Sequence, residues 1–312
     1  MTRLQSFKRK KTIDNAIDVA FCAPQLLLYT LFTLLPFVIA IPMVLTDYAN
    51  FLDQNVKFIG LANFISIFKS PVIEQLMPAL GKTAAFTLVN YSTLFIFSLP
   101  LALIMFEMNA RIKKAYFTVI FLPLMLSGVG LGMLISMLFS MDTGSINLLL
   151  TKLGLISKPL DIRDSSITAL VLPLLSGWRY AGYNMALFLS GLLAIPKETI
   201  DAGRVDGVNY WQRVRHIYLP QIVPNIMIAT VLCLLGSFGI FDECIGLGAL
   251  QGNPNAQYLS VLIYRMGFSS AGGGGSAAAG TLSQGVAISL AVYTPLLFLT
   301  FFLNKLQKKM QY

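Results

Sequence analysis

Six long stretches of the chain are apolar and almost free of charge, and they restrict the fold more than any other feature. They are 19–46, 83–106, 115–141, 167–195, 217–241 and a run within 266–304 whose apolar part begins near Gln284. Arg179 is the only charged residue inside them. About 20 apolar residues in a helix cross the hydrocarbon core of a bilayer, and lipid admits only helices or closed barrels as spanning structures. The runs therefore predict an all-α, polytopic membrane protein with six transmembrane helices.

The distribution of charge predicts the orientation of these helices. The chain is 56% hydrophobic and 12% charged, whereas soluble domains carry about 25% charged residues. Its net charge of +9 would suggest a nucleic-acid partner in a soluble protein. Here 15 of the 23 Lys and Arg residues fall in the four segments that are cytoplasmic if the N-terminus is inside. Because cytoplasmic loops collect Lys and Arg, both termini are expected in the cytoplasm, and no nucleic acid is expected as a partner.

The apolar runs and the positions of the charged residues divide the chain into three parts. A basic cytoplasmic segment, 1–18, precedes a transmembrane unit, 19–304, and a short cytoplasmic tail, 305–312, follows it. The first apolar run is too long for the core of a signal peptide, so we expect it to remain as the first span. The transmembrane unit is interrupted by a polar cytoplasmic loop, 196–222.

The sequence of this loop predicts two short helices. Pro196 is favoured in the first turn of a helix, and the acidic Glu198 and Asp201 suit the positive end of the helix dipole. Gly207 suits a helix stop, and 208–216 can form a second helix. A helix–turn–helix across the inner membrane face fits either a solvated loop packed on its own bundle or a docking surface for a partner.

The spacing within the loop favours docking. Asp201-Ala202-Gly203 is followed after three residues by Gly207, and after nine more by Ile217-Tyr218-Leu219-Pro220. This pattern resembles the signature loop, E-A-A, three residues, G, nine residues, I-x-L-P, of the permease subunits of binding-protein-dependent ABC importers. Asp201 stands where Glu is usual, which shortens the side chain by one methylene. Gly203 stands where Ala is usual, which weakens a helix by about 0.5–1 kcal/mol.

Further segments resemble the carbohydrate branch of this family, the maltose and multiple-sugar permease type. They are AIPKETIDAGRVDGVNYWQRVRHIYLP, FIGLANFISIF, SMDTGSINLLL, GWRYAGYNMALFLSGL and GSFGIFDE. The resemblance covers roughly Leu26 to the C-terminus. Two outer segments depart from it: IGLGALQGNPNAQYLSV lacks the usual T-G-G-G-P form, and AGGGGSAAAG is an unusual insertion.

The resemblance implies a type I ABC importer permease fold and a set of partners. They are a second, homologous permease chain, two ATPase subunits and an extracytoplasmic solute-binding protein, in the cytoplasmic (inner) membrane of a bacterium, with membrane lipid around the bundle. ATP and Mg are expected on the ATPase subunits and no cofactor on this chain, which carries no G-x-x-x-x-G-K-[ST] loop. The resemblance implies contact with the ATPase through one set of loop residues. These residues are Asp201, Ala202, Gly203, Asp206, Gly207, Ile217, Leu219 and Pro220.

The expected substrate is a carbohydrate, with an oligosaccharide favoured and a glycerol phosphate ester or an acidic oligosaccharide as alternatives. Aromatic rings with a few polar groups suit sugar rings, and an ionisable residue inside a span usually faces a cavity or a partner. Arg179 is thus either a donor to substrate or one half of an ion pair with Asp242 or Glu243. The resemblance implies that the pathway draws on this part of the fourth run and on a segment of the fifth. The expected pathway residues are therefore Trp178, Arg179, Tyr180, Tyr183 and Asn184 in the fourth run and Ser237 and Phe238 in the fifth.

Two other classes of protein are alternatives to the importer. A secondary transporter or channel explains six spans and Arg179 but leaves the loop spacing unexplained. A membrane-embedded enzyme needs catalytic groups, and the sequence has no paired carboxylates in its spans and a single histidine, His216. The three cysteines, Cys22, Cys233 and Cys244, lack metal-ligand spacing and are expected to pack. No catalytic residue, no metal site and no enzymatic activity are therefore predicted.

Overall fold

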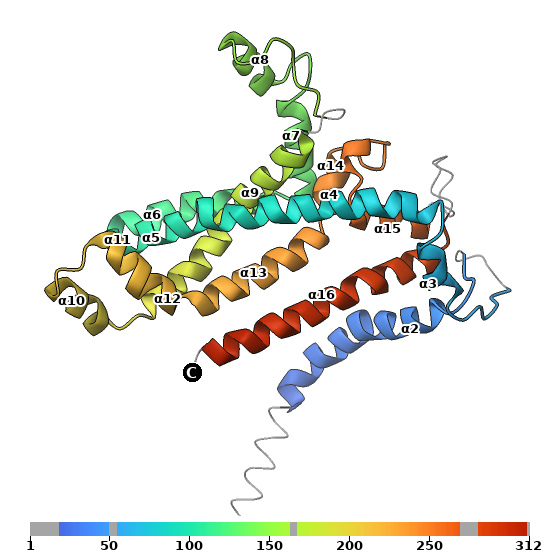
Figure 1. Cartoon of the computed structure of the whole chain (residues 1–312), viewed down its shortest axis with the longest axis horizontal. Helices are drawn as coiled ribbons and strands as arrows, with labels where there is room; N and C mark the ends of the chain where they lie inside the picture. Colours follow the sequence, from blue (N-terminus) through green and yellow to red (C-terminus); the bar gives the residue numbers. More distant parts are fainter. Residues whose placement is uncertain (1–18, 50–54, 163–166, 269–279, 311–312) are drawn as a thin grey trace, which may run out of the picture.

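The computed structural model describes residues 19–49, 55–162, 167–268 and 280–310, and these are almost entirely helical (Figure 1). The only β pairing among them is an isolated bridge between Thr46 and Phe58. The predicted all-α fold is therefore confirmed. The predicted N-terminal segment 1–18 and almost all of the glycine-rich insertion lie outside the described residues.

The centre of the bundle is α9, Thr168–Leu193, a helix of 26 residues. It packs against one continuous helix of 36 residues, Val72–Glu107. That helix comprises α4 (Val72–Thr93), the π-helical turn η2 (Leu94–Ser98) and α5 (Leu99–Glu107). The faces of α9 that meet α5 and α13 (Val223–Phe238) bury large apolar side chains, which include Met185, Phe188 and Leu192. α16 (Leu282–Met310) closes the other side against α3 (Ala62–Ile67) and α15 (Leu259–Phe268).

Length and composition support most of the predicted spans. Three helices of the described residues are long and apolar enough to cross a membrane: Val19–Met43, Val72–Glu107 and Leu282–Gln307. Two further pairs of helices qualify if each bent pair counts as one span, which gives up to five. α9 covers the fourth predicted run and is long enough to cross a membrane. It is not among these helices because its middle is more polar than theirs.

The third predicted span, 115–141, is not one straight helix. α6 (Ala110–Phe121) and the 3-10 turn η3 (Leu122–Met125) end at Leu126, and α7 (Gly128–Leu138) leaves at 87° to them. The cause is local, because Pro123 cannot donate a backbone hydrogen bond. Ser127 then starts a new helix as its N-cap, accepting a hydrogen bond from the Gly130 amide. Beyond α7, the short α8 (Ser145–Lys152) lies away from the bundle in Figure 1.

The fifth predicted span, 217–241, is also broken. Tyr210–Gln221 and Val223–Phe238 meet at 67° around Ile222. Pro220 and Pro224 lie on either side of this bend, and Pro224 removes the amide that would continue the helix. Residues 217–221 therefore belong to the loop 196–222, and the straight part of the span is α13, with 16 residues.

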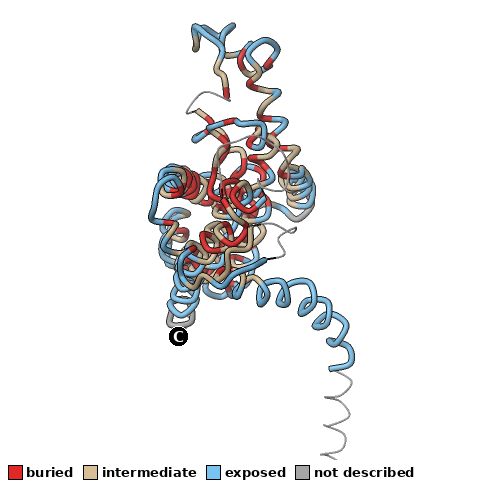
Figure 2. The backbone as a smooth tube through the Cα atoms, turned by 90° about the vertical axis from the view of Figure 1, so that its right-hand side faces the viewer, coloured by how far each residue is buried: buried red, intermediate tan, exposed pale blue. Residues whose placement is uncertain are grey.

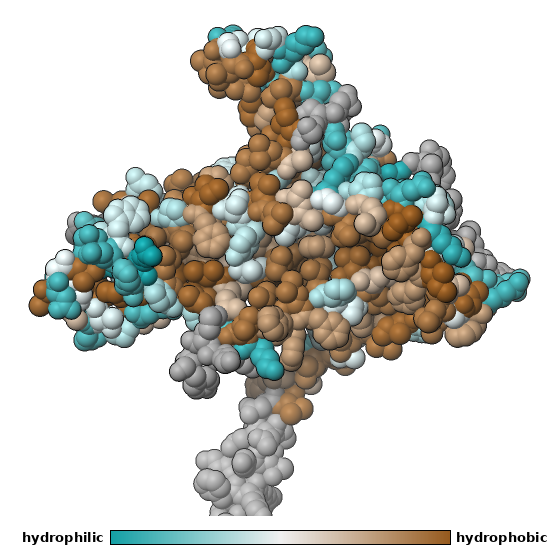
Figure 3. Space-filling model, viewed as in Figure 1, coloured by the Kyte–Doolittle hydropathy of each residue, from teal (hydrophilic) through white to brown (hydrophobic). Residues whose placement is uncertain are grey.

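Apolar surface covers the middle of the molecule. Figure 3 shows brown residues over the central part and teal residues gathered at the left end, over α10 and α11, and at the right edge. The first helix, Val19–Met43, has no buried residue in its apolar window and extends away from the bundle in Figure 2. This arrangement suits a molecule whose long axis crosses the bilayer.

A glycine contact joins α7 to α14 (Asp242–Gly246). Gly132 of α7 lies against Gly246 of α14. A Cβ on Gly132 would lie 2.8 Å from the Gly246 Cα and would overlap the Glu243 carbonyl. Backbone atoms cannot move aside as a flexible side chain can. The contact therefore fixes the start of α14, from which Glu243 projects.

Gly132→Ala is expected to lower the free energy of unfolding by about 1–3 kcal/mol, because the added methyl forces the two backbones apart. Gly81→Ala in α4 is the matched control: apart from the neighbouring backbone of its own helix, no atom lies within 4 Å of the added Cβ, and the change should stabilise by about 0.5–1 kcal/mol. Thermal unfolding in mild detergent measures both. Equal effects of the two variants would contradict the close contact.

Candidate functional site

A cavity of about 640 Å³ opens between α4, α9, α13 and α14. Its wall combines aromatic rings with neutral polar groups and three charged side chains. The aromatic members are Phe86, Tyr180, Tyr183 and Phe241, the neutral polar members are Asn90, Thr93, Ser176 and Asn184, and the charged members are Arg179, Asp242 and Glu243. A volume of this size, with aromatic walls and a few polar groups, is typical of a small-molecule site.

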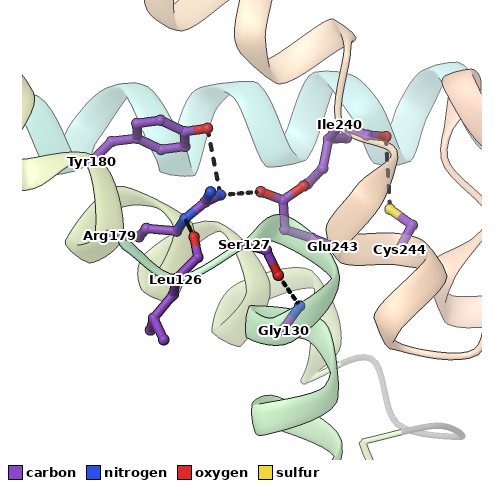
Figure 4. Close-up of polar contacts among 8 residues, drawn as sticks. All are labelled: Leu126, Ser127, Gly130, Arg179, Tyr180, Ile240, Glu243 and Cys244. Carbon is purple, nitrogen blue, oxygen red and sulfur yellow. Dashed lines mark hydrogen bonds and ion pairs between the residues drawn. The ribbon is translucent and has the colours of Figure 1, made fainter. Parts of the chain in front are cut away.

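A buried ion pair closes one side of this cavity (Figure 4). The Arg179 Nη1 atom lies 2.8 Å from the Glu243 Oε1 atom, and both side chains are about nine-tenths buried. The Arg179 Nε donates to the Leu126 carbonyl at 2.8 Å, and the guanidinium carbon of Arg179 lies 4.9 Å from the centroid of the Tyr180 ring. The break after η3 frees that carbonyl, so one arginine ties together α9, the η3–α7 turn and α14.

The structure brings together four of the seven predicted pathway residues. Arg179, Tyr180, Tyr183 and Asn184 line the cavity. The other three do not: Trp178 is 43% exposed on another face of α9, Ser237 is buried, and Phe238 packs with the cluster around α16.

Sequence reasoning missed the contribution of α4 to this wall. Asn90 faces the cavity and donates to the Ser237 hydroxyl at 3.0 Å, so it links α4 to α13. Asn90 is an amide in an otherwise apolar run, which was the available signal. Nothing in the sequence indicates which face of that run meets α9.

The predicted helix–turn–helix within residues 196–222 is confirmed. α10 (Lys197–Val205) begins after Pro196, and the chain turns at Gly207 with φ of +73°. α11 (Tyr210–Arg213) then starts with a capping box between Asn209 and Gln212. It continues through η4 (Val214–Tyr218) and α12 (Leu219–Gln221). Positive φ explains the glycine at position 207, because side chains strain that conformation.

The two sides of α10 differ. Asp201 and Ala202 are exposed, as are Val205 and Asp206, so this side is open to a partner. Gly203 is buried, and a Cβ there would lie 2.7 Å from the Ile217 Cδ1 atom. The departure from Ala at this motif position therefore gives space to Ile217 inside the loop.

The loop is held to the end of α5 through Tyr218. This tyrosine is fully buried, and its hydroxyl donates to the Glu107 Oε1 atom at 2.9 Å. Arg204 of α10 approaches the other carboxylate oxygen of Glu107 at 3.8 Å. α10 and the second half of the loop are thus linked to the C-terminal end of the long helix Val72–Glu107.

Tyr218→Phe is expected to cost about 1 kcal/mol of unfolding free energy. The Glu107 carboxylate loses a hydrogen bond, but it is partly exposed and water replaces the donor. Thermal unfolding measures the change, and Tyr116→Phe, at an exposed tyrosine of α6, is the control. No difference between the two variants would contradict the link to α5.

Residues 95–311 match the family described as "Binding-protein-dependent transport system inner membrane component". The chain belongs to this permease family. The lactose transport system permease protein LacF of Rhizobium radiobacter is 30% identical, over 86% of this chain and 87% of its own length. The arabinooligosaccharides transport system permease protein AraP of Bacillus subtilis is 28% identical, over 73% of this chain and 71% of its own length.

Solved structures give the same fold for this permease. A bacterial ABC transporter involved in the import of the acidic polysaccharide alginate aligns with a TM-score of 0.75 and 24% identity, covering 97% of this chain and 99% of that one. The predicted type I importer permease fold is confirmed. No group of three or more His, Cys, Asp or Glu residues suited to a metal ion occurs in the described part of the chain.

Proposed function

We propose that this permease is one of two homologous permease subunits in an ATP-driven importer of carbohydrates, with oligosaccharides as the favoured substrates. A solute-binding protein on the outer side delivers the substrate, and two ATPase subunits supply the energy. The names of the lactose and arabinooligosaccharide relatives support a carbohydrate. The cavity lined by Tyr180, Tyr183 and Asn184 carries the proposal, because it provides ring faces beside hydrogen-bonding groups.

Sugar rings are apolar on their C–H faces and hydroxylated at their rims. Tyr180, Tyr183 and Phe241 offer aromatic faces to the C–H faces of the sugar. Asn90 and Asn184 offer amides to its hydroxyl groups. Several weak contacts of this kind suit a pathway, since a transported solute must also leave its site. The same residues at the meeting of four helices would change their spacing when the bundle switches between inward- and outward-facing states.

The cytoplasmic loop is proposed to couple the bundle to the ATPase. The exposed side of α10, with Asp201 and Ala202, would lie in a groove of an ATPase subunit, since a small side chain permits close backbone approach. Closure of the ATPase pair around ATP would move α10. The contacts of Tyr218 and Arg204 with Glu107 would pass this movement to α5.

The remaining expectations belong to the same proposal. Both termini lie in the cytoplasm, on the evidence of the Lys and Arg distribution. ATP and Mg bind to the partner ATPase subunits, this chain itself holds no cofactor, and it performs no catalysis.

Reconstitution of the purified complex in liposomes tests the proposal. The permease, expressed with its genomic neighbours, should take up labelled oligosaccharide only when ATP, the ATPase subunits and the binding protein are all present. Uptake by the permease alone, without ATP, would overturn the proposal in favour of a secondary transporter or channel.

A further inference from the structure

The charges on the cavity wall do not suit an anionic solute. One arginine and two carboxylates, Arg179, Asp242 and Glu243, are the charged residues among the described residues that line it. Together they leave one net negative charge. The basic character of the whole chain, with a net charge of +9, is therefore absent from the cavity.

The positive charge of Arg179 is already compensated. Glu243 lies against it at 2.8 Å, and this pair is buried in a region where water screens charge poorly. Its Nε and Nη1 atoms bond to Leu126, Tyr180 and Glu243, whereas Nη2 has no hydrogen-bond partner among the described residues. Arg179 thus retains a donor for a hydroxyl group, without the net field that would attract a carboxylate or phosphate.

Asp242 supplies the uncompensated charge. It is exposed at the cavity wall and forms no ion pair with any residue that the structure describes. A carboxylate on a solute in the cavity would be repelled by Asp242. A neutral hydroxyl would donate a hydrogen bond to the Asp242 carboxylate or accept one from Arg179.

We infer that this permease selects neutral saccharides and disfavours anionic ones, both uronate oligosaccharides and phosphate esters. The inference rests on the proposed function and narrows its substrate class. It separates this permease from the transporter of its structural neighbour, which is involved in the import of the acidic polysaccharide alginate. A change at Asp242 alone should shift the selectivity.

A charge series at position 242 tests this inference in the reconstituted complete transporter. Wild type, Asp242→Asn and Asp242→Lys are each supplied with two pools of oligosaccharides of matched length. One pool is neutral, from starch and arabinan, and the other is acidic, from alginate and pectin. Because the same binding protein serves every variant, its own preference cancels when the neutral-to-acidic uptake ratios are compared. Asp142→Lys, at an exposed carboxylate between α7 and α8, is the control.

The ratio should fall about tenfold from wild type to Asp242→Asn and again to Asp242→Lys, and the control should match wild type. An unchanged ratio in the Lys variant would overturn the inference and leave the carbohydrate importer standing. ATP-driven uptake of neither pool by wild type would overturn the proposed function itself, and the inference with it.

Discussion

The Ala202→Arg variant is expected to lose ATP-driven uptake, by about thirtyfold or more, and to remain folded. Ala202 is exposed on α10, so the larger side chain can extend into solvent. In the assembled importer, the same side chain would fill the space into which the ATPase groove must close. Loss of a central interface contact commonly costs about 2 kcal/mol or more, which corresponds to this factor. Uptake into proteoliposomes and thermal unfolding of the permease measure the two expectations.

Ala194→Arg provides the matched control. Ala194 is an exposed alanine at the C-cap of α9, at the same end of the molecule but outside α10. It receives the same substitution and should keep near wild-type uptake. Equal uptake by both variants would show that α10 is not a coupling contact, and an unfolded Ala202→Arg permease would contradict the exposure of that position.

Removal of one partner of the Arg179–Glu243 pair is expected to have the largest effect on stability. In Glu243→Gln the guanidinium stays buried without its counter-charge, and breaking a buried pair in this way costs about 3–5 kcal/mol. Arg179→Met has a comparable cost, because Glu243 is then left alone. The double variant should be less destabilised than the sum of the two single variants, since no unpaired charge remains. Unfolding of the three variants in detergent gives the coupling energy.

Asp142→Asn is the control for this cycle. Its carboxylate is exposed, and its loss should change stability by no more than about 0.5 kcal/mol. Strictly additive single changes in the cycle would contradict the ion pair. Uptake by Glu243→Gln should fall together with stability, because Glu243 also fixes α14 at the cavity wall.

The apolar runs and the loop spacing predicted much of this permease. Length and charge located the helices, because lipid admits no other continuous spanning structure for such runs. The loop helices followed from Pro196 and Gly207, which act locally. Pro123 and Pro224 indicated kinks in their spans, but not bends as sharp as 87° and 67°, because a proline in a span gives either a kink or a complete break. Ser127 as an N-cap decided for a break in the first case.

The candidate cavity was predictable only in part. From the sequence, either of the adjacent carboxylates at positions 242 and 243 could pair with Arg179. In the structure, the first turn of α14 points Glu243 at the guanidinium. Arg179, Tyr180, Tyr183 and Asn184 could be assigned to one cavity from the sequence, since residues three or four apart lie on one face of a helix. Asn90 lies on a distant segment, and its place depends on how α4 packs against α9 and α13, which no local pattern records.

Photo-crosslinking from α10 in native membranes tests the coupling proposal most directly. A photoreactive residue replaces Ala202 in one sample and the exposed Thr151 of α8 in the other, and adducts are identified by mass spectrometry. We expect an adduct with the ATPase subunit from position 202, whose yield changes when ATP is bound, and none from position 151. An ATPase adduct from position 151 together with none from position 202 would contradict the coupling role of α10.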